Sequence, residues 1–469
     1  MEKTELARYF DALAPVRARY RRKGGYYHRK LEDYLNLLIP AGASVLEIGC
    51  GTGEFLARLN GSVKMGIDLS PGMIELARQN HPDIEFQVGD LEDLKINRVF
   101  DYILLVNVVG YLDDIQRGLE QLKKVCSAET RVIIVSYNYL WEPALKMAEF
   151  TRLRMKRPLQ NWLPAKDIEN LLGLADFEVI KRSYRFLVPL YIPLLSGWLN
   201  RFAAGLPLLR NFSLNQVIVS RWRKPVAGAD KRMVSVIIPC RNEKGNIEEA
   251  VKRLPSLGKH TEIIFVEGHS RDGSLEECQR VKGAYPSLDI KVLVQEGIGK
   301  GDAVRKGFAE AQGEVLMILD ADLTVAPEDL PKFYEVLVSG KGELVIGSRL
   351  VYQMEKQAMR WLNLLGNKFF SQMFTFLLEQ RIRDTLCGTK VLWRKDYNKI
   401  VSGRAYFGDF DPFGDFDLLF GAAKLNLKIA EIPIRYHDRT YGTTQIDRFR
   451  HGWLLLRMCL LALRKLKFV

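Results

Sequence analysis

Short, unbroken apolar runs alternate with amphipathic segments in the first half of the chain. The run SVLEIG (44–49), for example, leads into CGTGEFLARL, where apolar residues recur at helical spacing. Strands that are apolar throughout are buried on both faces, which is typical of parallel sheets flanked by helices. The same rhythm continues through VKMGID, IEFQVGD, DYILLVNV and RVIIVSY. This half is therefore predicted to be a doubly wound α/β domain that binds ligands at the carboxyl ends of its strands.

The second half repeats this rhythm with different motifs. Its predicted strands are MVSVIIPC (233–240), TEIIFVE, IKVLVQ, EVLMILDAD and ELVIGSR. The stretch between the halves, SRWRKPVAGADKRM (220–233), is charged and contains proline, glycine and alanine, as surface linkers do. We therefore expect two α/β domains, at 1–222 and 233–469, joined by a linker at 223–232.

Composition narrows this picture. The 469 residues are 47% hydrophobic and 27% charged, as in ordinary globular domains. Six scattered cysteines form no CxxC pair, which favours a reducing, cytoplasmic compartment over a zinc site or a disulfide framework. The sequence begins without the apolar core of a signal peptide, and no apolar run has the ~18 uncharged residues expected of a membrane span. The net charge of +13 favours anionic partners, and nucleotides, acidic lipids and nucleic acids all fit.

Glycines and acidic residues gather at the ends of the first predicted strands. The turn after the first strand contains Glu47, Gly49, Gly51 and Gly53. Glycine lets a backbone turn tightly and come close to a ligand. Asp68 and Asp90 end the next two strands, where their carboxylates can accept hydrogen bonds from ribose hydroxyls and from an adenine amino group.

This pattern resembles the class I S-adenosylmethionine-dependent methyltransferases over residues 40–220. The resemblance implies that the 47–53 turn binds S-adenosylmethionine, with Asp68 on the ribose and Asp90 on the adenine. Asn107 and Tyr111, after the DYILLVNV strand, would then line the side of the methyl acceptor. A nicotinamide-binding Rossmann domain is the alternative, but the turn lacks the usual dinucleotide spacing.

The methyl acceptor is not indicated by the sequence. A hydroxyl acceptor would benefit from a general base. His28, in GGYYHRKLEDYL, is either such a base or an ordinary polar residue on a capping helix. The proline- and leucine-rich stretch at 185–212 is a substrate lid, a membrane-facing surface or a packing element against the second domain, and the sequence does not choose among these.

Four motifs follow one another in the second half. They are VSVIIPCRNE, FVEGHSRDGS, GIGKGDAVRKGF and MILDADLTV. Together they resemble the family-2 glycosyltransferases of the GT-A fold, over 233 to about 450, and most nearly the polyprenyl-phosphate (dolichol-phosphate) mannosyl- and glucosyltransferases. The implied donor is a UDP- or GDP-sugar, and the implied acceptor is a polyprenyl phosphate.

The resemblance assigns roles to individual residues of these motifs. The nucleotide-sugar would be held by Pro239, Arg241, Glu243, Glu267, Lys300, Arg305 and Asp320. Asp320 and Asp322 form a DxD pair after an apolar strand, where two carboxylates can hold a hard cation such as Mg²⁺ or Mn²⁺. Thr324 stands where some relatives have a metal-contacting glutamine, which is a departure from the family pattern.

Two arginines match positions that grip phosphates in the family, Arg349 in VIGSRL and Arg439 in RYHDRTYGTTQ. Surface ion pairing is the alternative role for both. Relatives usually have Ser-Lys after the following glycine, whereas Thr444 and Gln445 stand here. A phosphate acceptor is already anionic and needs no general base, but a sugar hydroxyl would need a carboxylate.

The stretch FGDFDPFGDFDLLFGAAK supplies the carboxylates for that second possibility: Asp409, Asp411, Asp415 and Asp417. Asp415 or Asp417 is a catalytic base, a neighbour of the metal site or a helix N-cap.

Two further segments, 361–378 and 452–468, are apolar with few charges, and the second ends in basic residues. We expect them to lie at a membrane interface, on the inner face of a membrane, and core packing is the alternative.

The sequence as a whole predicts a bifunctional enzyme that combines metal-dependent sugar transfer to polyprenyl phosphate with methylation of a related glycan or lipid. Two alternatives remain. The sugar goes to a glycan hydroxyl, or the first domain binds S-adenosylmethionine only as a sensor or scaffold. Nucleic acid is disfavoured as a partner, because a fused sugar transferase suggests glycan or lipid metabolism.

Overall fold

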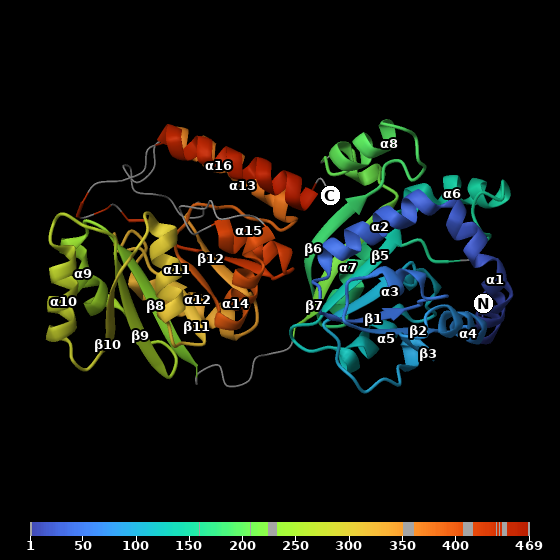
Figure 1. Ribbon diagram of the computed structural model, residues 1–469, viewed down its shortest axis with the longest axis horizontal. Coiled ribbons are helices and arrows are strands. Elements are labelled where there is room, and N and C mark those ends of the chain that lie inside the picture. The colour runs from blue at the N-terminus through green and yellow to red at the C-terminus, as the bar shows by residue number, and fades with distance from the viewer. Residues whose placement is uncertain are drawn as a thin grey trace. The chain divides into compact units, whose positions relative to one another are not determined.

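The computed structural model describes residues 2–158, 160–206, 208–223, 232–349, 361–406, 416–437, 439, 441–442 and 448–467. The chain divides into two compact units: Met1–Lys224 with Lys467–Val469, and Pro225–Leu466. Each unit is built around one sheet of seven described strands (Figure 1). The α/β class expected from the alternating pattern is confirmed for both units.

The sheet of the N-terminal unit has the order β3-β2-β1-β4-β5-β7-β6. Its strands are β1 (Ser44–Ile48), β2 (Val63–Asp68), β3 (Glu85–Val88), β4 (Tyr102–Val106), β5 (Arg131–Tyr137), β6 (Phe177–Arg185) and β7 (Asn215–Trp222). The first five are parallel, and β7 runs antiparallel to both β5 and β6. The strand order reverses between β1 and β4. Sheets of this kind bind ligands at the carboxyl ends of the strands beside this reversal.

Helices cover both faces of this sheet. They are α1 (Lys3–Lys23), α2 (Gly25–Leu38), α3 (Glu54–Arg58), α4 (Pro71–Asn80), α5 (Ile115–Gln121), α6 (Glu142–Phe150), α7 (Ala165–Leu174) and α8 (Leu195–Trp198). Buried residues of α2, α3 and α4 pack on one face, and those of α5 and α7 pack on the other. Burial on both faces is why the central strand β4 is apolar at every position and β5 is apolar through its middle.

The sheet of the C-terminal unit has the order β10-β9-β8-β11-β13-β12-β14. Its strands are β8 (Met233–Cys240), β9 (His260–Glu267), β10 (Asp289–Val294), β11 (Val315–Ile318), β12 (Leu344–Ser348), β13 (Lys390–Trp393) and β14 (Ile429–Pro433). Strand β13 is antiparallel to both of its neighbours, β11 and β12. The parallel strands β8, β9 and β11 therefore bring the turns that follow them to one edge.

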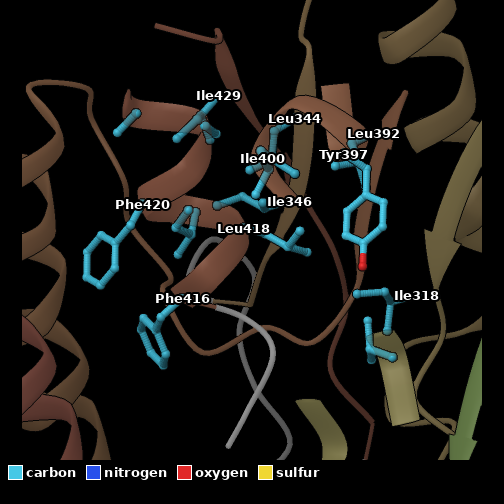
Figure 2. Packing of buried hydrophobic residues seen from close by; sticks show 14 of the residues in the cluster. Ile318, Leu344, Ile346, Leu392, Tyr397, Ile400, Phe416, Leu418, Phe420 and Ile429 are labelled. Atoms are coloured by element: carbon cyan, nitrogen blue, oxygen red, sulfur yellow. The ribbon is translucent and has the colours of Figure 1, made fainter. Parts of the chain in front are cut away.

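The helices of this unit also form two layers. They are α9 (Lys244–Arg253), α10 (Ser274–Ala284), α11 (Lys300–Glu310), α12 (Leu330–Val338), α13 (Trp361–Leu378), α14 (Arg394–Ser402), α15 (Phe416–Lys424) and α16 (Arg448–Ala462). Helices α9, α10 and α12 cover one face, and α11 and α13–α16 cover the other. Figure 2 shows Phe416, Leu418 and Phe420 of α15 in the second of these cores, beside Ile346 of β12.

The two segments expected at a membrane interface form α13 and α16, which contact each other. Each buries one face in the core, through Phe374 and Leu377 on α13 and through Met458 and Cys459 on α16. Trp453 of α16 is exposed. Among the described helices, none is long and apolar enough to cross a bilayer. Core packing, the alternative considered for these segments, therefore accounts for their buried faces.

Candidate active sites

The turn after β1 is shaped by glycines in the left-handed region. Gly49, Gly51 and Gly53 have φ values of 72°, 54° and 78°. A side chain is strained at such angles, and a Cβ on Gly49 would also overlap Val108. The backbone N–H groups of Gly49 and Cys50 both donate to Ile67 O, at 2.7 and 3.0 Å, which ties the turn to β2. The predicted turn is therefore a glycine cradle that is held in place by hydrogen bonds to β2.

The two aspartates expected at the cofactor lie on the same edge of the sheet. Asp68, the last residue of β2, accepts hydrogen bonds from Gly51 N (2.8 Å) and Ser70 N (3.0 Å). Burial raises the pKa of Asp68 despite these two donors. Asp90 accepts from Lys3 Nζ at 2.6 Å and from Glu92 N at 2.9 Å. Both carboxylates are thus fixed in direction, and each keeps lone pairs for a ligand.

Glu47 is the most unusual acid of this site. It is 2% exposed, and its Oε2 atom has no hydrogen-bond partner among the described residues. Burial raises its pKa to about 8, although Arg17 opposes the shift. Native proteins rarely leave a buried carboxyl oxygen unpartnered, so such an atom marks a place for a donor from outside the chain. The cradle, Asp68 and Glu47 therefore fit a cationic, ribose-bearing cofactor such as S-adenosylmethionine.

Helix α1 closes this site, although no sequence motif predicts this role. Asp11 Oδ1 accepts hydrogen bonds from Ser70 Oγ (2.5 Å) and Gly72 N (2.8 Å). A Cβ on Gly51 would lie 2.5 Å from Arg17 Cζ, so this guanidinium covers the glycine turn. These contacts join a polar helix to loops far along the chain, which local sequence patterns do not reveal.

The residues expected on the acceptor side lie beyond β4. Asn107 has a φ of 56°, and its Oδ1 is buried without a partner among the described residues. His28 is half-buried on α2, with its ring 5.7 Å from that of Phe55. Burial, together with nearby arginines, lowers the pKa of His28 to about 3. A histidine that stays neutral at ordinary pH is a weak proton acceptor, which disfavours the role of general base.

The DxD carboxylates of the C-terminal unit are both bound by cations. Lys300 Nζ lies 2.5 Å from Asp320 Oδ1, and Arg439 Nη2 lies 2.7 Å from Asp322 Oδ2. Burial by itself raises the pKa of Asp320, but Lys300 and Lys390 more than reverse it, so the pKa lies below its usual value. Asp322 also accepts from Thr324 Oγ1 at 2.8 Å.

Oxygen donors of this kind suit Mg²⁺ or Mn²⁺ chemically. No group of three or more His, Cys, Asp or Glu side chains within the described ranges is arranged to hold a metal ion. A metal on Asp320 and Asp322 would therefore replace contacts that Lys300 and Arg439 now make.

The turn after β8 adjoins this pair. Glu243 accepts from Arg439 Nη1 at 2.9 Å and from Asn246 Nδ2 at 2.7 Å, so Arg439 bridges Glu243 and Asp322. Burial raises the pKa of Glu243, although Arg439 opposes the shift.

Other residues assigned to the nucleotide-sugar lie on the same turns. Pro239 is in β8 and Arg241 is exposed directly after it. Glu267 ends β9 and accepts from Ser270 N at 2.5 Å, and Arg305 lies in α11. The predicted residues at the ends of β8 and β9 therefore lie together at the carboxyl ends of these parallel strands.

Two residues that the sequence did not single out complete the surroundings of Asp320. A Cβ on Gly388 would fall well inside contact distance of Asp320 Oδ2 and Lys300 Nζ. Lys390 is 1% exposed and donates to Cys387 O at 2.6 Å. The local sequence would predict that a lysine in β13 lies at the surface, because lysine is seldom buried. Its position at the DxD pair depends on the antiparallel insertion of β13 beside β11.

The remaining candidates have partners of their own. Arg349 forms a bidentate pair with Asp384, with Nε to Oδ2 at 2.6 Å and Nη2 to Oδ1 at 2.7 Å. Asp417, at the start of α15, accepts from Arg404 Nε at 2.7 Å. Asp415, with Asp409, Asp411, Thr444 and Gln445, lies outside the described residues. The phosphate-binding role of Arg349 and the base role of Asp417 stay predictions.

Two protein-family models match the two parts of the chain that contain these sites. Residues 19–182 match the model of a methyltransferase domain, and residues 235–401 match the model of glycosyl transferase family 2. The chain joins a methyltransferase domain to a family 2 glycosyltransferase domain. The glycine cradle with Asp68 lies in the methyltransferase domain, and the DxD pair lies in the glycosyltransferase domain.

Individual relatives cover parts of the chain. A dolichol-phosphate mannosyltransferase of Pyrococcus furiosus is 39% identical over 120 residues, which are 25% of this chain and 33% of that protein. An undecaprenyl-phosphate 4-deoxy-4-formamido-L-arabinose transferase of Pseudomonas aeruginosa is 32% identical over 139 residues, or 29% of this chain and 40% of the relative. The matched part of the chain thus spans well under half the length of these curated relatives. A solved S-adenosylmethionine-dependent methyltransferase of Thermotoga maritima, described as a possible histamine N-methyltransferase, matches 46% of this chain and 99% of its own, with 18% identity and a TM-score of 0.37.

Proposed function

We propose that the glycosyltransferase domain transfers a sugar from a UDP- or GDP-sugar to a polyprenyl phosphate. The observation that carries this proposal is the pairing of Asp320 with Lys300 and of Asp322 with Arg439 at the carboxyl ends of the strands. A site with both acidic and cationic side chains can bring a diphosphate and a phosphate together. The acidic side chains hold a metal cation, and the lysine and arginine side chains bind phosphate oxygens. The similarity to a dolichol-phosphate mannosyltransferase and to an undecaprenyl-phosphate 4-deoxy-4-formamido-L-arabinose transferase supports the choice of acceptor.

The proposed reaction follows from these charges. A phosphate oxygen of the lipid attacks the anomeric carbon, and the bond to the nucleoside diphosphate breaks. The acceptor oxygen is already anionic, so no side chain has to remove a proton. Lys300 and Arg439 balance the charge that grows on the leaving diphosphate. A divalent cation on Asp320 and Asp322 would add to that stabilisation when bound.

For the methyltransferase domain, we propose S-adenosylmethionine-dependent methylation of a related glycan or lipid acceptor. Glu47 and Asp68 hold and orient the cofactor, and the glycine turn lets it approach the backbone. The bound cofactor supplies an electrophilic methyl group, and positioning of the acceptor in line with it can supply most of the rate. The role of the chain is therefore mainly to place two ligands and exclude water.

We also propose that the chain contacts a membrane peripherally, through the stretch 186–214 that follows β6. Leu194 is 93% exposed and Leu208 is 84% exposed. Further large apolar side chains in this stretch are exposed, among them Leu190, Tyr191, Trp198 and Phe212. Single exposed leucines are common, but such a concentration marks an interaction surface. The stretch contains Arg201 and Arg210 and no acidic residue, which favours an anionic lipid surface.

Vesicle flotation tests this contact. The full chain should float with vesicles that contain phosphatidylglycerol, and Leu194→Asp/Leu208→Asp should reduce the bound fraction about tenfold, because both leucines lose their place among the acyl chains. Leu174→Asp, at a leucine that is 57% exposed on α7, is the matched control and should float as the wild type does. If the double variant floats as well as the wild type, this surface does not make the membrane contact.

Both catalytic proposals are tested by one doubly labelled reaction. A sugar-labelled donor and methyl-labelled S-adenosylmethionine are incubated with polyprenyl phosphate and Mg²⁺ or Mn²⁺. Sugar label in a chloroform-soluble, acid-labile product supports the lipid phosphate as acceptor. Methyl label in the same product, or in a glycan built on it, supports the proposed methylation, and methyl label that stays entirely in the cofactor contradicts it.

A further inference from the structure

A group of buried polar atoms without partners lies where β4 and β5 end in the methyltransferase domain. The atoms are the Tyr27 hydroxyl, Asn107 Oδ1 and both side-chain polar atoms of Asn215. Asn215 is fully buried and Tyr27 is 7% exposed. None of these atoms has a hydrogen bond of ordinary geometry with any described residue. Buried polar atoms without well-formed hydrogen bonds are costly in native proteins, and a ligand that offers better partners would bind favourably here.

Three elements bring these atoms together beside the cofactor turn. Tyr137, the last residue of β5, is paired with Asn215 of β7 in the antiparallel register. Asn107 N donates to Val135 O of β5 at 2.7 Å. The Tyr27 hydroxyl makes weak hydrogen-bonding contacts, short of ordinary geometry, with the side chains of Tyr137, Asn215 and Asn107, and these contacts influence its pKa. Val108, which follows Asn107, packs against Gly49, so the group adjoins the turn assigned to S-adenosylmethionine.

Arg157 supplies an uncompensated positive charge at this place. Its guanidinium lies 5.6 Å from the centre of the Tyr137 ring, and its Nη1 is 3.5 Å from the Tyr111 hydroxyl. Within the described part of the chain it forms no ion pair with a carboxylate, whereas its neighbour Arg154 is paired with Glu149 at 2.6 Å. Arg157 is also only half-exposed. A half-buried guanidinium that faces phenols and lacks an acid is suited to an oxyanion from outside the chain.

We propose that the methyl acceptor binds at Tyr27, Asn107, Tyr137 and Asn215 and carries an oxyanion, a carboxylate or a phosphate ester, that Arg157 holds. This inference rests on the proposed methyltransferase activity and specifies its substrate class. The two asparagine side chains bind neutral donors and acceptors of the ligand, such as sugar hydroxyls, and Arg157 binds the anion. Arg157 and the asparagines thereby fix the acceptor beside the cofactor turn.

The electrostatics of Tyr137 agree with this arrangement. Burial by itself raises the pKa of the Tyr137 phenol, but Arg157 and Arg154 outweigh burial, and the pKa lies below its usual value. The site therefore already favours negative charge before any ligand enters. Burial raises the pKa of Tyr27 well above its usual value, so that this phenol stays a hydrogen-bond donor.

Fluorine NMR of the full chain labelled with 3-fluorotyrosine tests the proposal, because it reports anion binding at a known place without turnover. The signals of Tyr137 and Tyr111 are assigned with Tyr137→Phe and Tyr111→Phe. With S-adenosylhomocysteine saturating, inorganic phosphate and D-glucuronate are titrated at constant ionic strength. We expect at least one of these anions to shift both signals saturably, and the signal of Tyr285, in the other unit, to stay in place.

Arg157→Met removes the charge and keeps most of the side-chain volume, and it should weaken the anion about tenfold or more. Lys156→Met is the matched control, because Lys156 is the adjacent exposed cation and should leave the affinity within about twofold. Arg157→Lys should recover part of the loss.

A response to phosphate alone identifies a phosphate ester, and a response to glucuronate alone identifies a carboxylate. Signals that move for neither anion, or move equally in Arg157→Met, overturn the proposal. Binding of S-adenosylhomocysteine is measured on the same samples. If it binds and the anions do not, this inference alone fails, and if it does not bind, the proposed methyltransferase function fails with it.

Discussion

Replacing Gly388 with alanine is expected to reduce sugar transfer at least about 100-fold, with little loss of overall stability. The added methyl group would collide with Asp320 Oδ2 and Lys300 Nζ, so both charged groups have to move. Asp320 is one half of the DxD pair, and displacement of a catalytic group by about 1 Å commonly has an effect of this size. The measurement is kcat/KM for transfer to polyprenyl phosphate, with circular dichroism to confirm folding.

Gly283→Ala is the matched control for this change. Gly283 lies in α10 of the same domain, and a Cβ there would meet no atom within 4 Å. Alanine is also the better helix former, so activity should be unchanged and stability slightly higher. Full activity of Gly388→Ala would mean that Asp320 and Lys300 can rearrange without cost, which would contradict the role assigned to their present positions.

The second large effect is expected at the buried ion pair of Arg349 and Asp384. The Asp384 side chain is fully buried, and it also accepts hydrogen bonds from Arg349 N and Leu386 N. Burial by itself raises the pKa of Asp384, but Arg349 outweighs it and holds the pKa below its usual value. Asp384→Ala leaves a buried guanidinium unpaired, and the glycosyltransferase domain should lose about 3–5 kcal/mol in its free energy of unfolding. Urea unfolding followed by fluorescence measures the loss.

Two further variants separate burial from pairing at this site. Arg253 and Glu328 form an equally bidentate pair, at 2.8 and 2.9 Å, but on the surface, so Glu328→Ala should cost less than about 1 kcal/mol. Arg349→Met/Asp384→Leu replaces the buried pair with apolar groups and should recover most of the stability. If the stable double variant also keeps its affinity for polyprenyl phosphate, Arg349 does not bind the acceptor phosphate.

The central strands of both domains, such as β4 and β11, could be predicted from the sequence because their burial on two faces imposes unbroken apolar runs, whereas β6, β7, β13 and β14 were not predicted. The DxD pair and the glycine turn could be predicted for a related reason. Asp320 and Gly49 come directly after such runs, and the ends of parallel strands meet at one edge of a sheet. In these cases the functional residues directly adjoin the apolar strand that makes them recognisable in the sequence.

The remaining parts of the sites depend on contacts between segments far apart. Asp384 reaches Arg349 across 35 positions of the chain, and Arg439 reaches Glu243 across 196. Lys390 carries no sign of burial in its own neighbourhood. Arg157 follows an irregular stretch with no motif, and only the positions of Tyr137 and Tyr111 show what its charge faces. Residues of this kind become visible only when the tertiary structure shows which groups have partners and which have none.

The central claim is sugar transfer to a lipid phosphate at the DxD pair, and a labelled donor panel tests it most directly. UDP-glucose, GDP-mannose and UDP-N-acetylglucosamine are each incubated with polyprenyl phosphate and Mg²⁺ or Mn²⁺, with wild-type protein and with Asp322→Ala. We predict that one donor transfers label into the chloroform phase and that Asp322→Ala abolishes this transfer. Metal-dependent donor binding without any lipid product would contradict the claim and indicate a glycan hydroxyl as acceptor, with Asp415 or Asp417 as the base.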